Sequence, residues 1–257
     1  MCIFAKIYED LLKMKIYQNI LSSKAKEKKL LCILIDPDKS SVRTVEKIAV
    51  MAEDAGVDYF FIGGSLITND TMKKCISVMK ETSAIPVIIF PGNTMQINPD
   101  ADAILFLSLI SGRNAEMLIG KHVIAAPYLR RTSLEIIPTG YILVDSGHPT
   151  AASYMSNTLP IPYYKDDIAV CTAMAGEMLG LKMIYIDAGS GAGKPVSISM
   201  IEQVKKNISV PLIIGGGIDS PVKAKKIYQA GADMIVVGNA VEKDPALIPQ
   251  LAHARNI

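Results

Sequence analysis

Eight short apolar runs, spread along the whole chain, constrain its fold most. They are rich in Ile, Val and Phe and lie at 30–36, 58–64, 86–92, 103–109, 140–146, 183–189, 211–217 and 233–239. Such runs indicate strands that are buried on both faces and are therefore parallel. Helical patterns separate most of them, at 41–55, 70–82, 113–120, 166–179, 198–207 and 220–230. The alternation predicts an α/β protein, a single (β/α)8 barrel domain over residues 1–257.

Two connections depart from a regular TIM barrel. Between Gly92 and Asp102 only about ten residues are available, with Asn and Pro among them, which is too short for a crossover helix. We therefore expect a modified barrel with one outer helix replaced by a short connection. The segment 147–164 is rich in Pro, Ser, Thr and Asn, and we expect a long loop on the active face, a candidate lid.

The opening segment, MCIFAKIYEDLLKMK, has the pattern of an amphipathic helix. It carries acidic residues and no cleavage pattern, so it does not resemble a secretory signal. Met14 is an alternative start, which would make residues 1–13 an N-terminal extension.

Composition excludes several classes of protein. The 27 basic and 25 acidic residues leave a net charge of +2, which gives no field for binding nucleic acid. No apolar run reaches the ~18 residues that a membrane-spanning helix needs. The cysteines at positions 2, 32, 75 and 171 are widely spaced, and we interpret them as reduced core thiols. These features favour a cytoplasmic protein.

Three glycine-bearing strand ends follow one another in the last third of the chain: YIDAGSG (185–191), IIGGGID (213–219) and IVVGN (235–239). The carboxyl ends of parallel strands meet at one rim, where bare backbone N–H groups can bind phosphate. Each glycine alone could be a simple turn; together they favour a phosphate site. GAGK (191–194) is not a nucleotide-binding P-loop, because Ala188 stands where Gly is required and Pro195 replaces Ser or Thr.

Polar side chains at the same rim are candidates for chemistry. Asp36 closes the first run and is a candidate Mg²⁺ ligand; an Asx turn that caps the next helix is an equally good interpretation of DPDK. Ser65, after the second run, could reach the same metal. Asp187 needs a partner if buried, and Tyr185 lies on the same side of its strand. The three histidines, at 122, 148 and 253, lack metal-binding spacing and are interpreted as structural.

Together, IDPDK, FIGGS, SLISGRNAEMLIGKH, YIDAGSGAGKPV, IIGGGI and IVVGNAV resemble the geranylgeranylglyceryl phosphate synthase family of prenyltransferases, in its second sequence group. The resemblance runs from Leu31 to Asp244. It implies a barrel that lacks one helix. It also implies Mg²⁺-dependent transfer of geranylgeranyl (C20) from its diphosphate to the C3 hydroxyl of sn-glycerol 1-phosphate, with release of diphosphate, a step of ether lipid synthesis.

Carried over by motif, the resemblance implies Mg²⁺ at Asp36 and Ser65 and a catalytic role for Asp187 and Tyr185. It implies glycerol phosphate contacts at Tyr185, Ile186, Asp187, Ala188, Gly189, Ser190, Gly191, Gly216, Gly217, Gly238 and Asn239. Many relatives have Glu where Asp187 stands. Some bacterial relatives have Lys where Leu34 stands, so another cation would have to meet phosphate, for which Lys194 and Arg113 are candidates. We also expect a homo-oligomer and transient membrane contact for product release.

The prenyl tail needs an apolar trench, for which Ile89, Phe90, Leu105, Phe106 and Leu107 are candidates beside the missing helix. Alternatively these side chains fill the barrel interior. Ala125 aligns near the far end of the tail path in the family. Two competing functions are an isomerase or epimerase of a sugar phosphate, which would want a second acid or base and a small polar pocket, and a catalytically idle barrel that senses a phosphometabolite.

Overall fold

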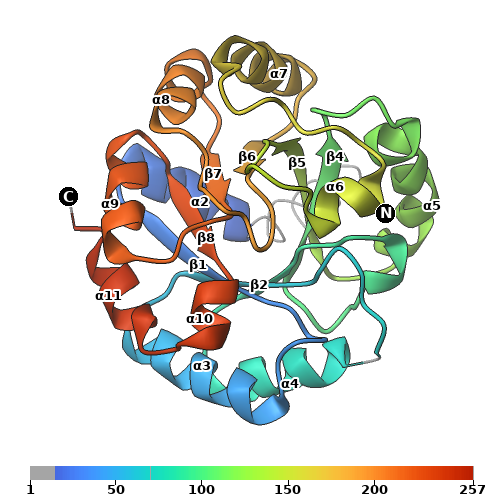
Figure 1. Ribbon diagram of the computed structural model, residues 1–257. Helices are drawn as coiled ribbons and strands as arrows, with labels where there is room; N and C mark the ends of the chain where they lie inside the picture. Colours follow the sequence, from blue (N-terminus) through green and yellow to red (C-terminus); the bar gives the residue numbers. More distant parts are fainter. Residues whose placement is uncertain (1–14, 70, 257) are drawn as a thin grey trace.

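Eight parallel strands close into a barrel in their chain order (Figure 1). The computed structural model describes residues 15–69 and 71–256. The strands are β1 (Leu30–Ile35), β2 (Tyr59–Ile62), β3 (Val87–Ile89), β4 (Ala103–Leu109), β5 (Glu135–Leu143), β6 (Met183–Asp187), β7 (Leu212–Gly215) and β8 (Met234–Val237). β1 pairs with both β2 and β8, which closes the sheet. The predicted (β/α)8 barrel is confirmed.

Helices surround the barrel. They are α3 (Val42–Asp54), α4 (Met72–Thr82), η2 (Glu116–Gly120), α5 (Lys121–Leu129), α7 (Asp166–Met178), α8 (Ile198–Asn207) and α9 (Pro221–Gln229), with α10 (Asn239–Lys243) and α11 (Leu247–His253) after β8. α3 is typical: Ser41 caps it by accepting from the Thr44 N–H, and Val45, Ile48 and Ala52 bury one face.

The connection between β3 and β4 holds only η1 (Thr94–Gln96), a single short turn of 3-10 helix. The predicted loss of one outer helix is therefore confirmed. Two other boundaries were wrong. The helix expected at 113–120 instead runs through η2 and α5 to Leu129, past Pro127, and β5 begins at Glu135 rather than near 140. The segment 147–164 also contains a short helix, α6 (Ala151–Ser156), which Thr150 caps.

The core has two shells. Inside the barrel, Phe61 and Tyr185 belong to one buried cluster; between barrel and helices, Ile184 and Ile186 belong to another. Alternation along β6 explains the division, because successive side chains point to opposite faces. Burying each large apolar side chain contributes about 1.5–3 kcal/mol, so both shells stabilise the fold.

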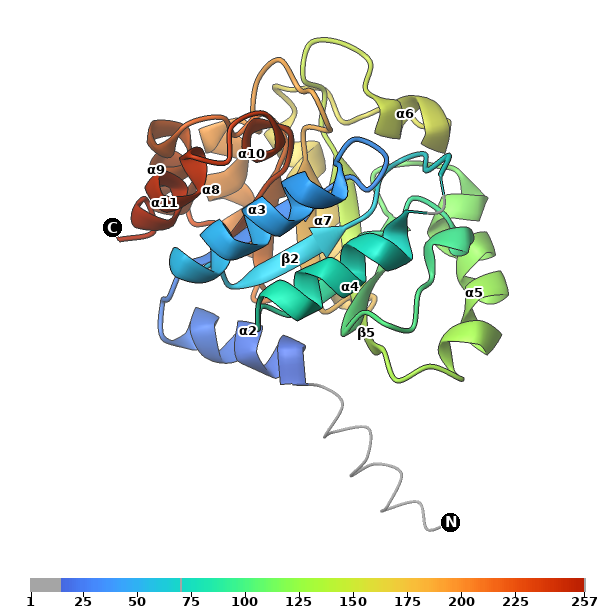
Figure 2. The same ribbon diagram turned by 90° about the horizontal axis from the view of Figure 1, so that it is seen from below.

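One end of the barrel is closed by α2 (Lys15–Ala25), at the opposite end from α6 (Figure 2). Ile16, Tyr17 and Ile20 pack against the interior cluster. The buried Glu135 carboxylate accepts the N–H groups of Ile16 and Tyr17, both at 2.8 Å, at the positive end of the helix dipole. The site must therefore lie at the other end. The alternative start at Met14 and the proposed extension 1–13 lie outside the described residues.

The cysteines match the expectation only in part. Cys32 and Cys75 are free and buried, as predicted for core thiols, whereas Cys171 on α7 is exposed because it lies on the outer face of that helix. Cys2 lies outside the described residues. Within residues 15–69 and 71–256, no helix combines the length and the apolar character that crossing a membrane requires.

Candidate active site

A polar pocket lies at the carboxyl ends of the strands, as predicted. Its lining includes Asp36, Lys39, Gly64, Ser65, Phe90, Tyr141, Ala152, Tyr185, Asp187, Gly189, Ser190, Gly191, Gly216, Gly217, Gly238, Asn239, Glu242 and Lys243. All the predicted metal and glycerol phosphate residues line it except Ile186 and Ala188. Those two side chains are buried in the outer cluster. The Ala188 N–H donates to the Gly215 carbonyl. The ligand contacts of all these residues stay predictions.

Asp187 ends β6 inside the pocket and is buried. Its Oδ2 accepts from the Tyr141 hydroxyl at 2.6 Å, and its Oδ1 accepts from the Gly189 N–H at 2.7 Å. Burial raises the pKa of the Asp187 carboxyl, and the two hydrogen bonds offset part of that shift. The result is a fixed carboxylate that binds a proton more readily than an exposed Asp.

Aromatic rings gather beside Asp187. Tyr185 stacks on Phe90 with ring centres 5.4 Å apart and meets the edge of Tyr141 at 5.4 Å, while Phe90 meets Tyr141 at 5.7 Å. Burial raises the pKa of both tyrosines well above its usual range, so both hydroxyls stay protonated. The rings present π faces and one fixed hydroxyl donor to the pocket.

Asp36 follows β1 and forms the Asx turn that was one interpretation of DPDK, while its role as a Mg²⁺ ligand stays a prediction. Its Oδ1 accepts from the Asp38 N–H at 3.1 Å, which is the Asx turn, and its Oδ2 lies 2.7 Å from the Lys39 ammonium. The Asp36 backbone N–H donates to Glu242 Oε1 at 2.8 Å. Two carboxyl groups, those of Asp36 and Glu242, therefore lie on this side of the pocket. Burial raises the pKa of the Glu242 carboxyl.

The glycines after β7 are required by their backbone. Gly216 and Gly217 have φ of +80° and +69°, in the left-handed region. A Cβ on Gly216 would lie 2.7 Å from Asp187 Oδ1, and one on Gly217 would lie 2.8 Å from the Lys194 backbone. The bare backbone therefore lets the β7 loop approach the loop after β6 and leaves its N–H groups near the pocket. Asn239, after β8, accepts from the Ser190 hydroxyl at 3.1 Å and links the third loop.

Neither cation that the sequence offered for phosphate lines the polar pocket. Lys194 instead lies over two rings of the 147–164 segment, 3.6 Å from the centre of Tyr163 and 5.5 Å from that of Tyr164. Arg113 donates to the neighbouring Gly112 carbonyl. The lysines that do line the pocket are Lys39 and Lys243. Lys194 therefore fixes the loop after β6 through a cation–π contact.

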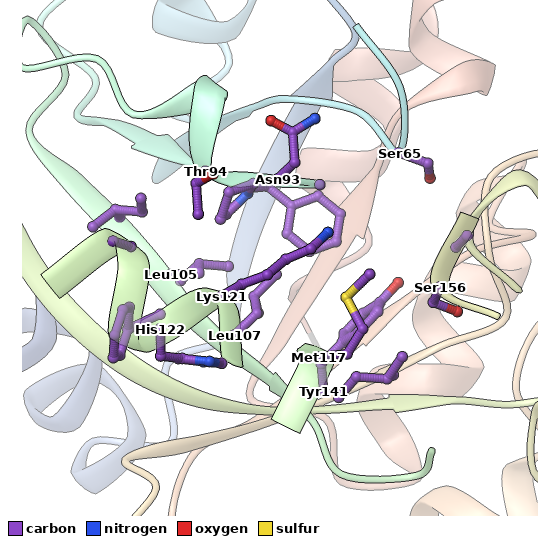
Figure 3. A pocket seen from close by; sticks show the side chains of 18 of the residues that line it. Ser65, Asn93, Thr94, Leu105, Leu107, Met117, Lys121, His122, Tyr141 and Ser156 are labelled. Carbon is purple, nitrogen blue, oxygen red and sulfur yellow. The ribbon is translucent and has the colours of Figure 1, made fainter. Parts of the chain in front are cut away.

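An apolar pocket adjoins the polar one beside the helix-free β3–β4 connection (Figure 3). Its walls include Leu105, Phe106 and Leu107 from β4, Met117 from η2, and Lys121, Ala125 and Leu129 from α5. Four of the five predicted trench residues line it. Ile89 does not, because its side chain points outward into the outer cluster.

Five residues line both pockets: Gly64, Ser65, Phe90, Tyr141 and Ala152. The two spaces are therefore adjacent, with Ser65 and the aromatic rings at their junction. Ala152 comes from α6, so the short helix of the 147–164 segment covers this junction. Its role as a lid stays a prediction.

Sequence reasoning missed Tyr141 and Glu242. Tyr141 lies within a predicted strand, but its pairing with Tyr185, which makes it face the same interior, is visible only in the structure. Glu242 had no signal in the sequence, because only the fold brings α10 against the start of the DPDK turn. His122, interpreted as structural, lines the apolar pocket, and its Nε2 lies 3.2 Å from the Ser108 hydroxyl.

Comparison with known proteins finds similar chains among geranylgeranylglyceryl phosphate synthases. The geranylgeranylglyceryl phosphate synthase of Spirosoma linguale is 55% identical over 225 residues, which are 88% of this chain and 90% of that protein. The protein of the same name from Thermococcus gammatolerans is 40% identical over 88% of this chain and 89% of its own. The (S)-3-O-geranylgeranylglyceryl phosphate synthase of Thermoplasma acidophilum, solved with sn-glycerol-1-phosphate, superposes with a TM-score of 0.88 at 33% identity, covering 93% of this chain and 97% of that one.

The match to a protein family extends over nearly the whole described barrel, from residue 23 to residue 254. It includes every strand and every loop that lines the two pockets. With the fold, the paired pockets and these relatives in agreement, the chain belongs to the PcrB family.

Proposed function

We propose that this chain is a prenyltransferase that joins geranylgeranyl diphosphate to the C3 hydroxyl of sn-glycerol 1-phosphate, forming geranylgeranylglyceryl phosphate. One observation carries the proposal: a glycine-rimmed polar pocket adjoins an apolar pocket and shares five lining residues with it. The reaction needs this pairing, because one substrate is a small anion and the other carries a long apolar chain. The activity is the one for which the relatives are named.

Glycerol phosphate fits the polar pocket with its phosphate at the loops after β7 and β8. The backbone around Gly216, Gly217, Gly238 and Asn239 would donate to the phosphate, and the hydroxyl end would face Asp187. Asp187 then orients the C3 hydroxyl and takes its proton, while Tyr141 and Gly189 hold the carboxylate in place.

The transfer exchanges one C–O bond for another. The bond between prenyl C1 and the diphosphate oxygen breaks, the C3 oxygen of glycerol phosphate bonds to C1, and the hydroxyl proton passes to Asp187. Breaking the allylic bond leaves positive charge on the prenyl carbons. Phe90 and Tyr141 lie at the junction of the pockets, where their π faces can stabilise that charge.

The rim fits Mg²⁺. The Asp36 carboxylate already faces a cation, the Lys39 ammonium, and the Ser65 hydroxyl lines both pockets. In the described residues no group of three or more His, Cys, Asp or Glu forms a protein-only metal site. Mg²⁺ commonly takes one or two carboxylates and completes its shell with water and substrate phosphate. When bound by Asp36 and Ser65, it would supply positive charge to the leaving diphosphate.

The apolar pocket also separates the proposal from its competitors. A sugar-phosphate isomerase or epimerase has no use for a second, apolar space beside its phosphate site. A phosphometabolite sensor has no use for Asp187 fixed by two hydrogen bonds in the polar pocket.

The direct test is incubation of the chain with radiolabelled sn-glycerol 1-phosphate and a series of prenyl diphosphates, with and without Mg²⁺. We expect a labelled, solvent-extractable product that forms fastest with the C20 donor and stops when EDTA removes the metal. Absence of product with every donor at saturating Mg²⁺ would refute the assignment.

Asp36→Asn tests the metal ligand. The amide cannot supply the charge that holds Mg²⁺, so we expect kcat to fall by about 100-fold or more and the Mg²⁺ concentration for half-maximal rate to rise. Asp54→Asn, at the exposed end of α3, is the matched control and should behave as wild type. A folded Asp36→Asn enzyme with normal Mg²⁺ dependence would remove Asp36 from the metal site.

A further inference from the structure

The apolar pocket contains one group whose chemistry contradicts its surroundings. Among the described residues that line this pocket, Lys121 is the only Lys or Arg. It is the first residue of α5, and Figure 3 shows its side chain extending from the helix into the pocket. A prenyl chain alone has no use for an ammonium group in its binding site.

Spacing along η2 and α5 fixes where Lys121 lies in the pocket. Lys121 and Ala125 are four residues apart on α5 and therefore share one helix face, and Met117 comes from the π-helical turn η2 just before it; all three line the pocket, so they form one stripe on its wall. Met117 and Lys121 are nearer the start of this stripe, while Ala125 and Leu129 follow. Each step of four residues advances about 6 Å along a helix. The Lys121 ammonium on its four-carbon stem can therefore reach the pocket junction, while the stem itself lines the apolar wall.

Within the described residues, no carboxylate forms an ion pair with Lys121. An ammonium on an apolar wall without an anion is unfavourable, and an anionic ligand would relieve that cost. The other pocket lysines are placed differently: Lys39 is paired with Asp36, and Lys243 lies on α10 beside the loop that holds Gly238 and Asn239. Lys121 faces the junction from the opposite wall.

We propose that Lys121 binds the diphosphate of the prenyl substrate and neutralises its charge as it leaves. The inference rests on the proposed function and adds a substrate-binding residue to it. Two anions meet at this site, and the structure provides a separate cation for each: Lys243 on the glycerol phosphate side and Lys121 on the prenyl side. A diphosphate at the junction would contact Lys121 while its chain runs along the same wall toward Ala125.

Lys121→Met tests the charge, because Met keeps an unbranched apolar stem and has a similar helix propensity. We expect the KM for geranylgeranyl diphosphate to rise about 10-fold or more, the loss typical of a hydrogen bond to a charged group, with the KM for glycerol phosphate nearly unchanged. Lys121→Arg should restore most of the affinity. Lys47→Met, on the exposed face of α3, controls for loss of one positive charge from the chain.

A binding measurement with no tail separates charge from apolar contact. Titration calorimetry with inorganic pyrophosphate and Mg²⁺ should show about 10-fold weaker binding to Lys121→Met than to wild type, with glycerol phosphate binding equal in both. Unchanged pyrophosphate affinity, or a lower KM for the prenyl substrate in Lys121→Met, would overturn the proposal. Absence of prenyl transfer by the wild-type chain would instead refute the proposed function, so the two failures are distinguishable.

Discussion

At the scale of single residues, Asp187 shows most directly how a residue of the site lowers the stability of the fold. Its carboxylate is buried, and only two hydrogen bonds, from Tyr141 and Gly189, compensate it. A buried charge with so few partners destabilises the folded state. The proposed role of Asp187 as proton acceptor would explain why a carboxyl group occupies this unfavourable position.

Asp187→Asn should therefore abolish activity without weakening the fold. The amide can still accept from Gly189 and can donate to the Tyr141 oxygen, so the packing survives. Without the proton acceptor we expect kcat to fall by about 10²–10⁴-fold. The melting temperature at neutral pH should stay equal to that of wild type or rise. A variant that keeps wild-type kcat would show that Asp187 does not take the proton.

The difference in stability between Asp187→Asn and wild type should change with pH in a definite direction. Burial raises the pKa of Asp187 in the folded state. Its contribution to stability is therefore fully present below the ordinary pKa of Asp and is lost as pH rises through the raised value. The stability advantage of Asp187→Asn should be largest at neutral pH and should vanish in acid. Thermal melts of both proteins across this range provide the check, and an advantage that grows on acidification would contradict the pKa shift.

At the scale of elements, the regular parts of the barrel followed from local pattern. β4 and α8 begin and end where the apolar runs predicted, because their burial and their periodicity coincide. β5 was predicted too short, since Glu135 and Pro138 break the apolar run at its start. Only the packing of α2 against Glu135 explains why that polar residue belongs to a buried strand.

The candidate site was likewise predictable from the sequence only in part. Its glycines and Asp187 were visible as motifs at strand ends. The partners that fix them were not, because Tyr141 reaches Asp187 across 46 residues of sequence and Glu242 reaches Asp36 across 206. Contacts of that kind depend on how the barrel closes. The position of the Lys194 side chain was hidden for the same reason: Lys194 follows a glycine-rich loop in sequence, but its ammonium group lies over the Tyr163 ring.

The wall made by α5 should set the length of the prenyl chain. Ala125 is buried and lines the apolar pocket, so Ala125→Trp should fill the end of the tail path and shorten the longest accepted donor. Ala126→Trp is the matched control, because the next residue of the same helix is exposed and outside the pocket lining. The assay compares rates across a series of prenyl diphosphates. A chain-length profile that is identical in both variants and wild type would place the tail elsewhere.

At the scale of the whole molecule, the barrel has three unlike faces. α2 closes one end, the glycine loops and α6 occupy the other, and the missing helix opens the side that η2 and α5 border. The outward side of these helices is apolar as well: Ile119, Val123, Ile124 and Tyr128 are 57–65% exposed. A contiguous apolar surface of this kind is typical of a protein interface. We expect it to be covered by a second copy of the chain.

The chain should therefore have a mass in solution of at least twice its 27.8 kDa, and Val123→Glu should lower that mass by placing a charge in the interface. Val222→Glu on α9 is the matched control, since Val222 is 66% exposed, almost the same as Val123 at 65%. Light scattering after size exclusion gives the masses.

Because α5 presents Lys121 and Ala125 to the pocket on its other side, dissociation should also raise the KM for the prenyl donor more than that for glycerol phosphate. A monomeric wild-type chain, or an assembly that Val123→Glu leaves intact, would assign this face another role.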